Sequence, residues 1–148
     1  MSTYKSFAAF IDALALTTSA LRAHMRKRFK DCNLDLSSEM MQVMYYLWDH
    51  NGVNQQEIAD AVNRDKATLT SLIDNLVRRQ LVERREDPQD RRSKRIVLTA
   101  KGQDLKQHIV PLLHEMYTLA GQMLPENQLR ATTSVLERIT QNLTAPTG

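Results

Sequence analysis

The sequence predicts a mainly α-helical protein that contains one small β-hairpin. Apolar residues recur at three- and four-residue intervals through most of the 148-residue chain, which is the spacing of a helix face turned toward a core. Two short runs, residues 81–85 and 94–98, instead resemble strands, and the turn-forming segment 87–90 lies between them. No linker rich in Pro, Gly or Ser divides the chain, so we expect a single domain over residues 1–148.

The first predicted helix covers about residues 5–32. Its apolar residues keep near-helical spacing, and basic residues crowd its end. The apolar stripe consists of Phe7, Phe10, Ile11, Leu14, Leu21, Met25 and Phe29. A helix of this length extends beyond one small domain, so we expect part of its apolar face to pack against a second copy of the chain.

A second helix is predicted from about Ser37 to His50. Ser37 or Ser38 can accept hydrogen bonds from the free N–H groups of its first turn. The helix is rich in large, adaptable side chains, and core packing accounts for most of them. They are Met40, Met41, Val43, Met44, Tyr45, Leu47 and Trp48.

Two shorter helices separated by a tight break follow at about residues 54–62 and 66–79. Asn54 can cap the first, with Glu57 three residues later as in a capping box. Asp65 can cap the second, because its carboxylate accepts free N–H groups and complements the positive end of the helix. This order of elements is that of a helix-turn-helix.

The second of these helices has one apolar and one polar face. Its apolar residues are Leu69, Leu72, Ile73, Leu76 and Val77. Its outward residues are Thr68, Ser71, Asn75 and Arg78, with Thr70 at the edge. Short hydroxyl and amide side chains can contact base edges or phosphates in a major groove, while Lys66 and Arg78 add positive charge at either end.

The predicted hairpin is strongly basic. Ten of the 20 Lys and Arg residues but only five of the 17 Asp and Glu residues lie between Arg78 and Lys106, so this stretch carries +5 and the remainder −2. Such an uneven distribution is expected of a nucleic-acid contact. Arg91 and Arg92 fall at the hairpin tip, where a guanidinium can enter a narrow minor groove. A helix-turn-helix followed by this hairpin predicts a winged helix-turn-helix.

Two further helices are predicted between about residues 100 and 144. Thr99 can cap the first, and Pro125 lies near the start of the second, where its missing N–H would be unpaired in any case. The apolar residues of the first are Leu105, Ile109, Leu112, Leu113, Met116 and Met123, and those of the second are Leu129, Val135, Leu136, Ile139 and Leu143.

The chain resembles the MarR family of winged helix-turn-helix transcriptional regulators. The resemblance rests on residues 56–59 and 67–76 and, above all, on Asp-Pro-Gln-Asp-Arg-Arg at 87–92 followed by Val-Leu-Thr-Ala-Lys-Gly at 97–102. It implies a DNA-binding lobe at about residues 36–100 and dimerisation helices at about 5–32 and 100–144. Family members often have Arg at the positions of Ser71 and Asn75, and Gly at that of Gln80.

The helix face, the hairpin and the resemblance together give the residues expected at double-stranded DNA. They are Arg64, Lys66, Thr68, Thr70, Ser71, Asn75, Arg78, Asp90, Arg91, Arg92 and Lys94. A two-fold homodimer would present two copies of this set, so the expected target is an operator with an inverted repeat.

The family also binds small aromatic or phenolic effectors between the dimer arm and the DNA lobe. By this resemblance, an effector pocket is expected at Arg22, His24, Met41, Met44, Tyr45 and Trp48. Such an effector would release a repressor from its operator.

Two alternative functions remain open at this stage. The same fold can bind another protein, with the Arg residues of the hairpin facing an acidic partner. Alternatively, Cys32, the single cysteine, could act as an oxidation switch, because Lys30 and Arg28 favour its thiolate.

Other functional classes find no support in the sequence. It contains no Gly-rich phosphate loop, zinc-binding helix motif or nucleophile elbow, so we expect neither an enzyme nor a cofactor or metal site. No apolar run is long enough to cross a bilayer and no signal peptide is recognisable, so we expect no membrane partner and a cytoplasmic protein.

Overall fold

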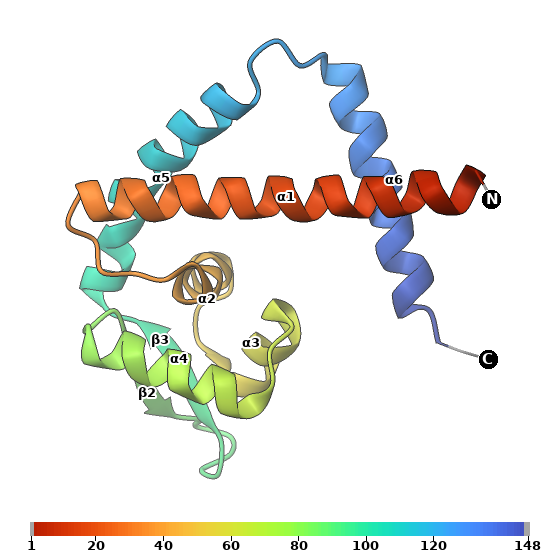
Figure 1. Cartoon of the computed structure of the whole chain (residues 1–148). Helices are drawn as coiled ribbons and strands as arrows, with labels where there is room; N and C mark the ends of the chain where they lie inside the picture. Colours follow the sequence, from red (N-terminus) through yellow and green to blue (C-terminus); the bar gives the residue numbers. More distant parts are fainter. Residues whose placement is uncertain (1, 147–148) are drawn as a thin grey trace. The chain divides into compact units, whose positions relative to one another are not determined.

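The computed structural model describes residues 2–146, and within them the chain forms six α-helices and three short strands (Figure 1). The prediction of a mainly α-helical fold with a small hairpin is confirmed. In chain order the elements are α1 (Ser2–Asp31), α2 (Ser38–Asp49), β1 (Val53–Asn54), α3 (Gln55–Val62), α4 (Lys66–Arg78), β2 (Val82–Glu86), β3 (Lys94–Leu98), α5 (Ala100–Ala120) and α6 (Glu126–Thr144).

Side-chain caps start the helices where the sequence predicts them. In each case a side-chain oxygen accepts a hydrogen bond from a backbone N–H three residues later, which satisfies one of the free donors of the first turn. The four pairs are Ser37 with Met40 (3.1 Å), Asn54 with Glu57 (2.9 Å), Asp65 with Thr68 (2.8 Å) and Thr99 with Gly102 (3.0 Å).

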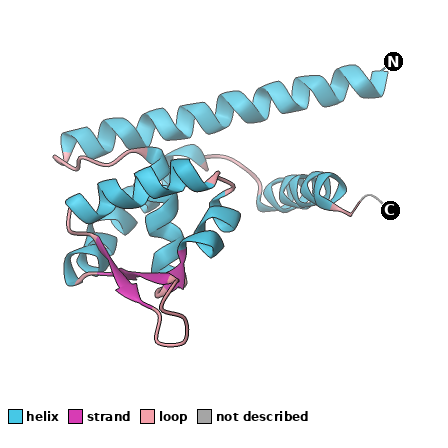
Figure 2. Cartoon of the chain, turned by 90° about the horizontal axis from the view of Figure 1, so that it is seen from below, coloured by secondary structure: helices cyan, strands magenta, loops and turns pink. Residues whose placement is uncertain are grey.

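The hairpin consists of β2 and β3 in antiparallel pairing, with Arg84 opposite Ile96. Its first strand begins one residue later than predicted. Leu81 lies instead in the turn that closes α4, where its N–H donates to the carbonyl of Leu76 (3.0 Å). Figure 2 shows the loop of the hairpin projecting from the sheet.

The sheet also contains a third strand that the sequence did not predict. β1 pairs with β3, with Val53 opposite Ile96, so β3 is the central strand in the order β1-β3-β2. Two residues are too few to show the alternation by which strands are recognised. β1 joins the sheet directly to the start of α3.

The chain divides into two compact units, residues 1–116 and 117–148. The core of the first unit contains apolar residues from α1 to α5, and its fully enclosed side chains include Leu47, Ile58, Leu69, Ile73 and Ile96. Met25 and Phe29 bring the end of α1 into this core.

The apolar residues in the first half of α1 lie outside that core. Phe7 is 49% exposed, and Ile11 and Leu14 are each 37% exposed. In the second unit, α6 buries none of its residues within the single chain, and Leu129, Val135 and Leu143 are exposed. Each unit therefore presents an apolar helix face that its own residues do not cover.

The start of α5 is fastened to the turn between α4 and β2. Three consecutive backbone carbonyls of this turn accept hydrogen bonds from the start of α5 and the residue before it. The Arg79 carbonyl accepts from Lys101 Nζ (2.9 Å). The Gln80 carbonyl accepts from the Thr99 hydroxyl (2.6 Å), and the Leu81 carbonyl accepts from the Thr99 N–H (3.1 Å). The prediction of Thr99 as a helix cap is confirmed by its bond to the Gly102 N–H. The same residue also bonds the turn between α4 and β2.

Gly102 allows this junction to pack closely. A Cβ at this position would lie 2.0 Å from the backbone oxygen of Leu81, which no side chain can tolerate. The carbonyl of Gly102 accepts a hydrogen bond from Trp48 Nε1 (2.9 Å), so α2 is held at the same point. The sheet, α2, α4 and α5 therefore meet around one glycine.

Gln80 occupies the left-handed region of the backbone, with φ of 60°. A residue with a side chain is strained there, whereas glycine is not. We expect Gln80→Gly to raise the free energy of unfolding by about 1 kcal/mol. The control is Gln107→Gly in the middle of α5, which we expect to lower it by about 1 kcal/mol. Denaturant unfolding of both variants checks the pair, and equal losses of stability would contradict the prediction.

Candidate nucleic-acid interface

The interface begins at the N-terminus of α4, which Asp65 fixes. Its carboxylate accepts hydrogen bonds from the backbone N–H of Thr68 (2.8 Å) and from the Thr68 hydroxyl (2.8 Å). These bonds, the backbone one foremost, hold the pKa of Asp65 below its ordinary value of 3.8. Thr68 thus donates its hydroxyl proton within the helix cap, and its hydroxyl oxygen remains able to accept a hydrogen bond from a ligand.

The lowered pKa predicts how this cap depends on pH. The ionised cap stabilises the folded state above the ordinary pKa of 3.8, and this stabilisation is lost as the pH falls through the still lower pKa of the folded state. We expect Asp65→Asn to unfold with a weaker dependence on pH in this acidic range than the wild type. Thermal unfolding between pH 2 and 6 is the measurement, and identical pH profiles for both proteins would contradict it.

The residues predicted for the polar face of α4 differ in their exposure to solvent. Lys66, Ser71 and Arg78 are exposed. Thr70 is half-buried, and its hydroxyl donates to the carbonyl of Lys66 (2.9 Å) and accepts from Gln55 Nε2 (3.2 Å). Thr70 therefore joins α4 to α3, while the three exposed side chains face solvent.

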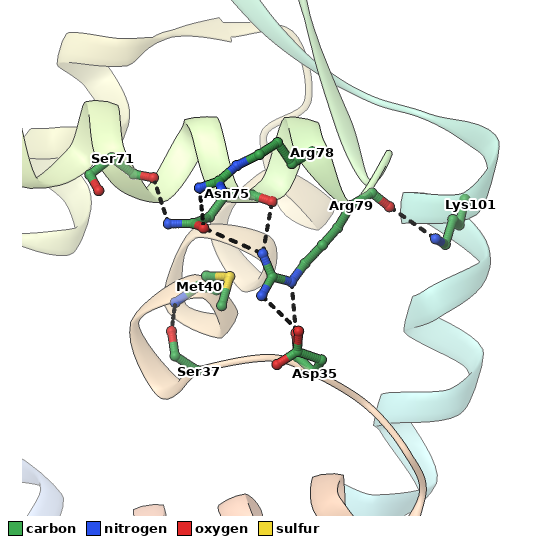
Figure 3. A network of polar contacts seen from close by, with 8 residues as sticks. All are labelled: Asp35, Ser37, Met40, Ser71, Asn75, Arg78, Arg79 and Lys101. Carbon is green, nitrogen blue, oxygen red and sulfur yellow. Dashed lines mark hydrogen bonds and ion pairs between the residues drawn. The ribbon is translucent and has the colours of Figure 1, made fainter.

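Further along the same face, Asn75 and Arg78 form a hydrogen-bonded pair (Figure 3). Arg78 Nη2 donates to Asn75 Oδ1 (2.6 Å), and Asn75 Nδ2 donates to the carbonyl of Ser71 (3.0 Å). Asn75 is half-buried beside the exposed Arg78. Two residues expected at DNA therefore hold each other in place before DNA is present.

Arg84 fastens the hairpin to the helix-turn-helix. From β2 it donates to Gln55 Oε1 at the start of α3 (3.2 Å) and forms an ion pair with Asp74 of α4 (2.6 Å). Sequence reasoning missed this contact, because its residues are separated by 10 and 29 positions and no local pattern links them. It sets the position of the wing relative to α4.

Two carboxylates shape the loop of the wing. Asp87 accepts the N–H of Gln89 (2.9 Å) and forms an ion pair with Arg95 (3.2 Å), and these contacts, the N–H foremost, lower the pKa of Asp87. Asp90 accepts the N–H of Arg92 (3.0 Å). Asp90, expected among the DNA-contacting residues, thus bonds the backbone of the tip.

The tip presents its cations to solvent, and the fold brings one of them near α4. Arg91, Arg92 and Lys94 are all exposed. A hollow of about 380 Å³ between α3, the first turn of α4 and the wing gathers Lys66, Arg92 and Lys94. Its other lining residues are Asn54, Gln55, Gln56, Ala59, Leu69 and Ser93. Cations from two separate elements therefore surround one concave surface, and their positive charge suits phosphate oxygens.

Arg64, also expected at DNA, lies in the break between α3 and α4. It is half-buried, and its Nε is a buried atom with no hydrogen-bond partner within the described part of the chain. Asn63 beside it ends α3 in the left-handed conformation, with φ of 52°.

The residues expected to line an effector pocket occupy different environments. Met41 and Met44 are enclosed in the core, whereas Arg22 is exposed and His24 is half-buried. Tyr45 packs edge-on against Trp48, with ring centroids 5.6 Å apart. Tyr45 also borders a surface hollow of about 450 Å³ between α2 and the end of α3. Of the six residues, Tyr45 alone lines this hollow.

Cys32, the residue of the redox alternative, follows α1 directly and is exposed. Across residues 2–146, no three His, Cys, Asp or Glu side chains gather as a metal site would require. The helices of the same range include none that is both long and apolar enough to cross a membrane.

A helix-turn-helix followed by a β-hairpin with a cationic loop defines a winged helix-turn-helix protein. The family model of the MarR family matches residues 36–94, which include α2 to α4 and the loop of the wing. This match shows a MarR-family domain over residues 36–94 of the chain.

Curated relatives are similar over little more than half of the chain. The transcriptional regulator HosA of Escherichia coli O111:H- is 32% identical over 78 residues, which are 53% of this chain and 58% of HosA. The HTH-type transcriptional repressor NicR of Pseudomonas putida is 30% identical over 89 residues, or 60% of this chain and 56% of NicR. The chain therefore spans little more than half the length of these relatives.

Solved structures share the fold over most of the chain. A MarR transcriptional regulator from Methanosarcina mazei Go1 matches with a TM-score of 0.80 and 25% identity, over 91% of this chain and 96% of that one. MepR of S. aureus, solved in complex with DNA, matches with a TM-score of 0.81 and 24% identity, over 90% and 97% of the two chains. These matches confirm the winged helix-turn-helix fold.

Proposed function

We propose that this protein is a sequence-specific transcriptional regulator that binds double-stranded DNA, acts as a homodimer and represses its target until a small effector releases it. The observation that carries the proposal is the gathering of Lys66, Arg92 and Lys94 around one hollow beside the exposed face of α4. Phosphates fit the hollow, while the exposed Ser71 on α4 can approach base edges.

The relatives support the same function. NicR is named as a repressor, and MepR, which has the same fold, is solved bound to DNA. In the proposal, residues 36–100 form the DNA-binding lobe of one domain over residues 1–148, and the protein works in the cytoplasm without catalytic activity. A homodimer would bind an inverted repeat whose half-site centres lie about 34–36 Å apart.

The uncovered apolar faces support the dimer. Phe7, Ile11 and Leu14 on α1 and Leu129 and Val135 on α6 remain exposed in the single chain. A second copy that covers them would remove this apolar area from water. The proposed effector is a small aromatic or phenolic compound held between the dimer helices and the lobe, where Arg22, His24, Tyr45 and Trp48 would contact it.

Selection of duplexes from a random pool by the purified protein tests the function directly. We expect one enriched inverted repeat and an affinity that falls steeply as salt rises, because bound cations displace counterions from DNA. If the protein does not bind duplex DNA even at low salt, the result would instead support the rival function, a winged-helix module that binds an acidic protein partner.

Ser71 and Lys66 are expected to respond differently in this assay. Ser71→Ala should change the enriched sequence, at a cost on the order of 1 kcal/mol for a lost base contact. Lys66→Ala should weaken binding to all sequences alike and reduce the slope of log affinity against log salt by about 1. An unchanged enriched sequence with Ser71→Ala would remove Ser71 from the base-contacting residues.

A further inference from the structure

Arg79 connects the segment between α1 and α2 to the polar face of α4 (Figure 3). Its Nε donates to the backbone oxygen of Asp35 (2.9 Å), and its Nη2 forms an ion pair with the Asp35 carboxylate (2.9 Å). Its Nη1 reaches Asn75, at the backbone oxygen (3.1 Å) and at Oδ1 (3.4 Å). One planar guanidinium thus bridges a connecting segment and a residue expected at DNA.

The contacts of Asn75 determine the orientation of its side-chain amide. Oδ1 accepts from both Arg78 and Arg79, and Nδ2 donates to the carbonyl of Ser71. A guanidinium has only donors and a backbone carbonyl only accepts, so the reverse orientation would lose all three bonds. Both acceptor positions of the oxygen are occupied, and one N–H of the amide remains for a ligand.

In the proposed complex, the remaining N–H would make Asn75 a donor toward DNA. A donor in the major groove matches the acceptor atoms of guanine, the N7 of adenine or the O4 of thymine, whereas an amide turned over would present its oxygen and favour the amino groups of adenine and cytosine. The orientation therefore carries sequence information. Arg78 is exposed, whereas Arg79 is half-buried and is held at two points by Asp35.

We infer that Arg79, held by Asp35, tunes base specificity by supporting, together with Arg78 and the Ser71 carbonyl, the orientation in which the Asn75 amide is a hydrogen-bond donor. Arg79 is a positioning residue, since it acts through Asn75. The inference rests on the proposed DNA-binding function and extends it to a residue outside the set expected at DNA.

The test is duplex selection and affinity measurement with the full chain carrying Asn75→Ala, Arg79→Lys, or both. Lys keeps the positive charge but lacks the fork that spans Asp35 and Asn75. We expect Arg79→Lys to lose about tenfold in discrimination at the same base pair that Asn75→Ala identifies. In the Asn75→Ala background, Arg79→Lys should add nothing, because its effect passes through the missing amide.

Asp35→Asn provides a second variant that leaves Arg79 in place, and it should alter the preference at the same base pair in the same direction. Glu115→Gln is the matched control, because it breaks an ion pair of similar length with Arg28 (3.0 Å) that contacts no residue of α4. This control should keep the wild-type sequence preference.

Three outcomes would overturn the inference: an unchanged preference with Asn75→Ala, an unchanged preference with both Arg79→Lys and Asp35→Asn, or an effect of Arg79→Lys that weakens all duplexes equally and persists without Asn75. In each of these the wild type still selects a sequence, and the proposed function stands. A wild-type protein that selects no duplex refutes the proposed function itself, and the inference with it.

Discussion

Replacement of both Arg91 and Arg92 by Ala should lower the affinity for the selected duplex by about a hundredfold while leaving the protein folded. Both side chains are exposed at the tip of the wing, and the backbone there is held by the carboxylates of Asp87 and Asp90 rather than by the arginines themselves. Loss of the guanidinium groups therefore removes contacts to DNA without removing the supports of the loop. The measurement is fluorescence anisotropy with labelled duplex.

The control removes the same charge elsewhere. Arg130 and Arg138 are exposed on α6, outside residues 36–94. Their double replacement by Ala should leave affinity within a factor of a few of the wild type. Circular dichroism and sedimentation of all variants establish equal folding and assembly. If Arg91→Ala/Arg92→Ala binds as tightly as the wild type, the wing has no role in DNA binding.

Replacement of Phe7 and Ile11 by Ser should dissociate the proposed dimer. The two side chains lie one helical turn apart on α1 and are 49% and 37% exposed in the single chain. Burial of each in a dimer contributes about 1.5 kcal/mol, and two subunits bring four such side chains, so the loss is about 6 kcal/mol or four orders of magnitude in the dissociation constant. Sedimentation equilibrium measures it, and operator binding should fall in parallel.

Asp12→Ser is the control on the same helix, because it removes an exposed polar side chain and no apolar area. The lobe of the Phe7 and Ile11 variant should keep its fold, since Met25 and Phe29 still anchor the end of α1 in the core. A dimer of unchanged stability would place the interface on other helices, with the exposed faces of α5 and α6 as the next candidates.

The features that sequence reasoning predicted are local ones. Asn54, Asp65 and Thr99 each bond a backbone N–H three residues away, so their role is set by chemistry within one turn of helix. The hairpin was predicted for the same reason, because Asp87 and Asp90 form their turn with residues two positions on.

The features that it missed depend on residues far apart in the chain. β1 is a strand only because β3 lies beside it, and Arg84 and Arg79 contact partners that lie up to 29 and 44 positions away. The one-residue shift of β2 has a local origin instead, since the left-handed Gln80 keeps Leu81 in the turn that closes α4. Whether Arg78, Lys66 and the other candidate residues contact DNA stays a prediction.

The hydrogen bonds of Thr99 to the turn before β2 attach the wing to α5 at one end, so a movement of α5 would be transmitted to the wing. β3 passes into α5 through this one residue, and β2 begins at the turn whose carbonyls the start of α5 holds, so both strands are clamped to the helix at the same end. A five-residue strand extends about 17 Å from this point of attachment. A rotation of α5 by about 10° about Thr99 would therefore move the far end of the hairpin by about 3 Å. That displacement equals the length of a hydrogen bond, so in the proposed DNA complex a small rotation of α5 would be enough to make or break the contacts of the wing with a groove.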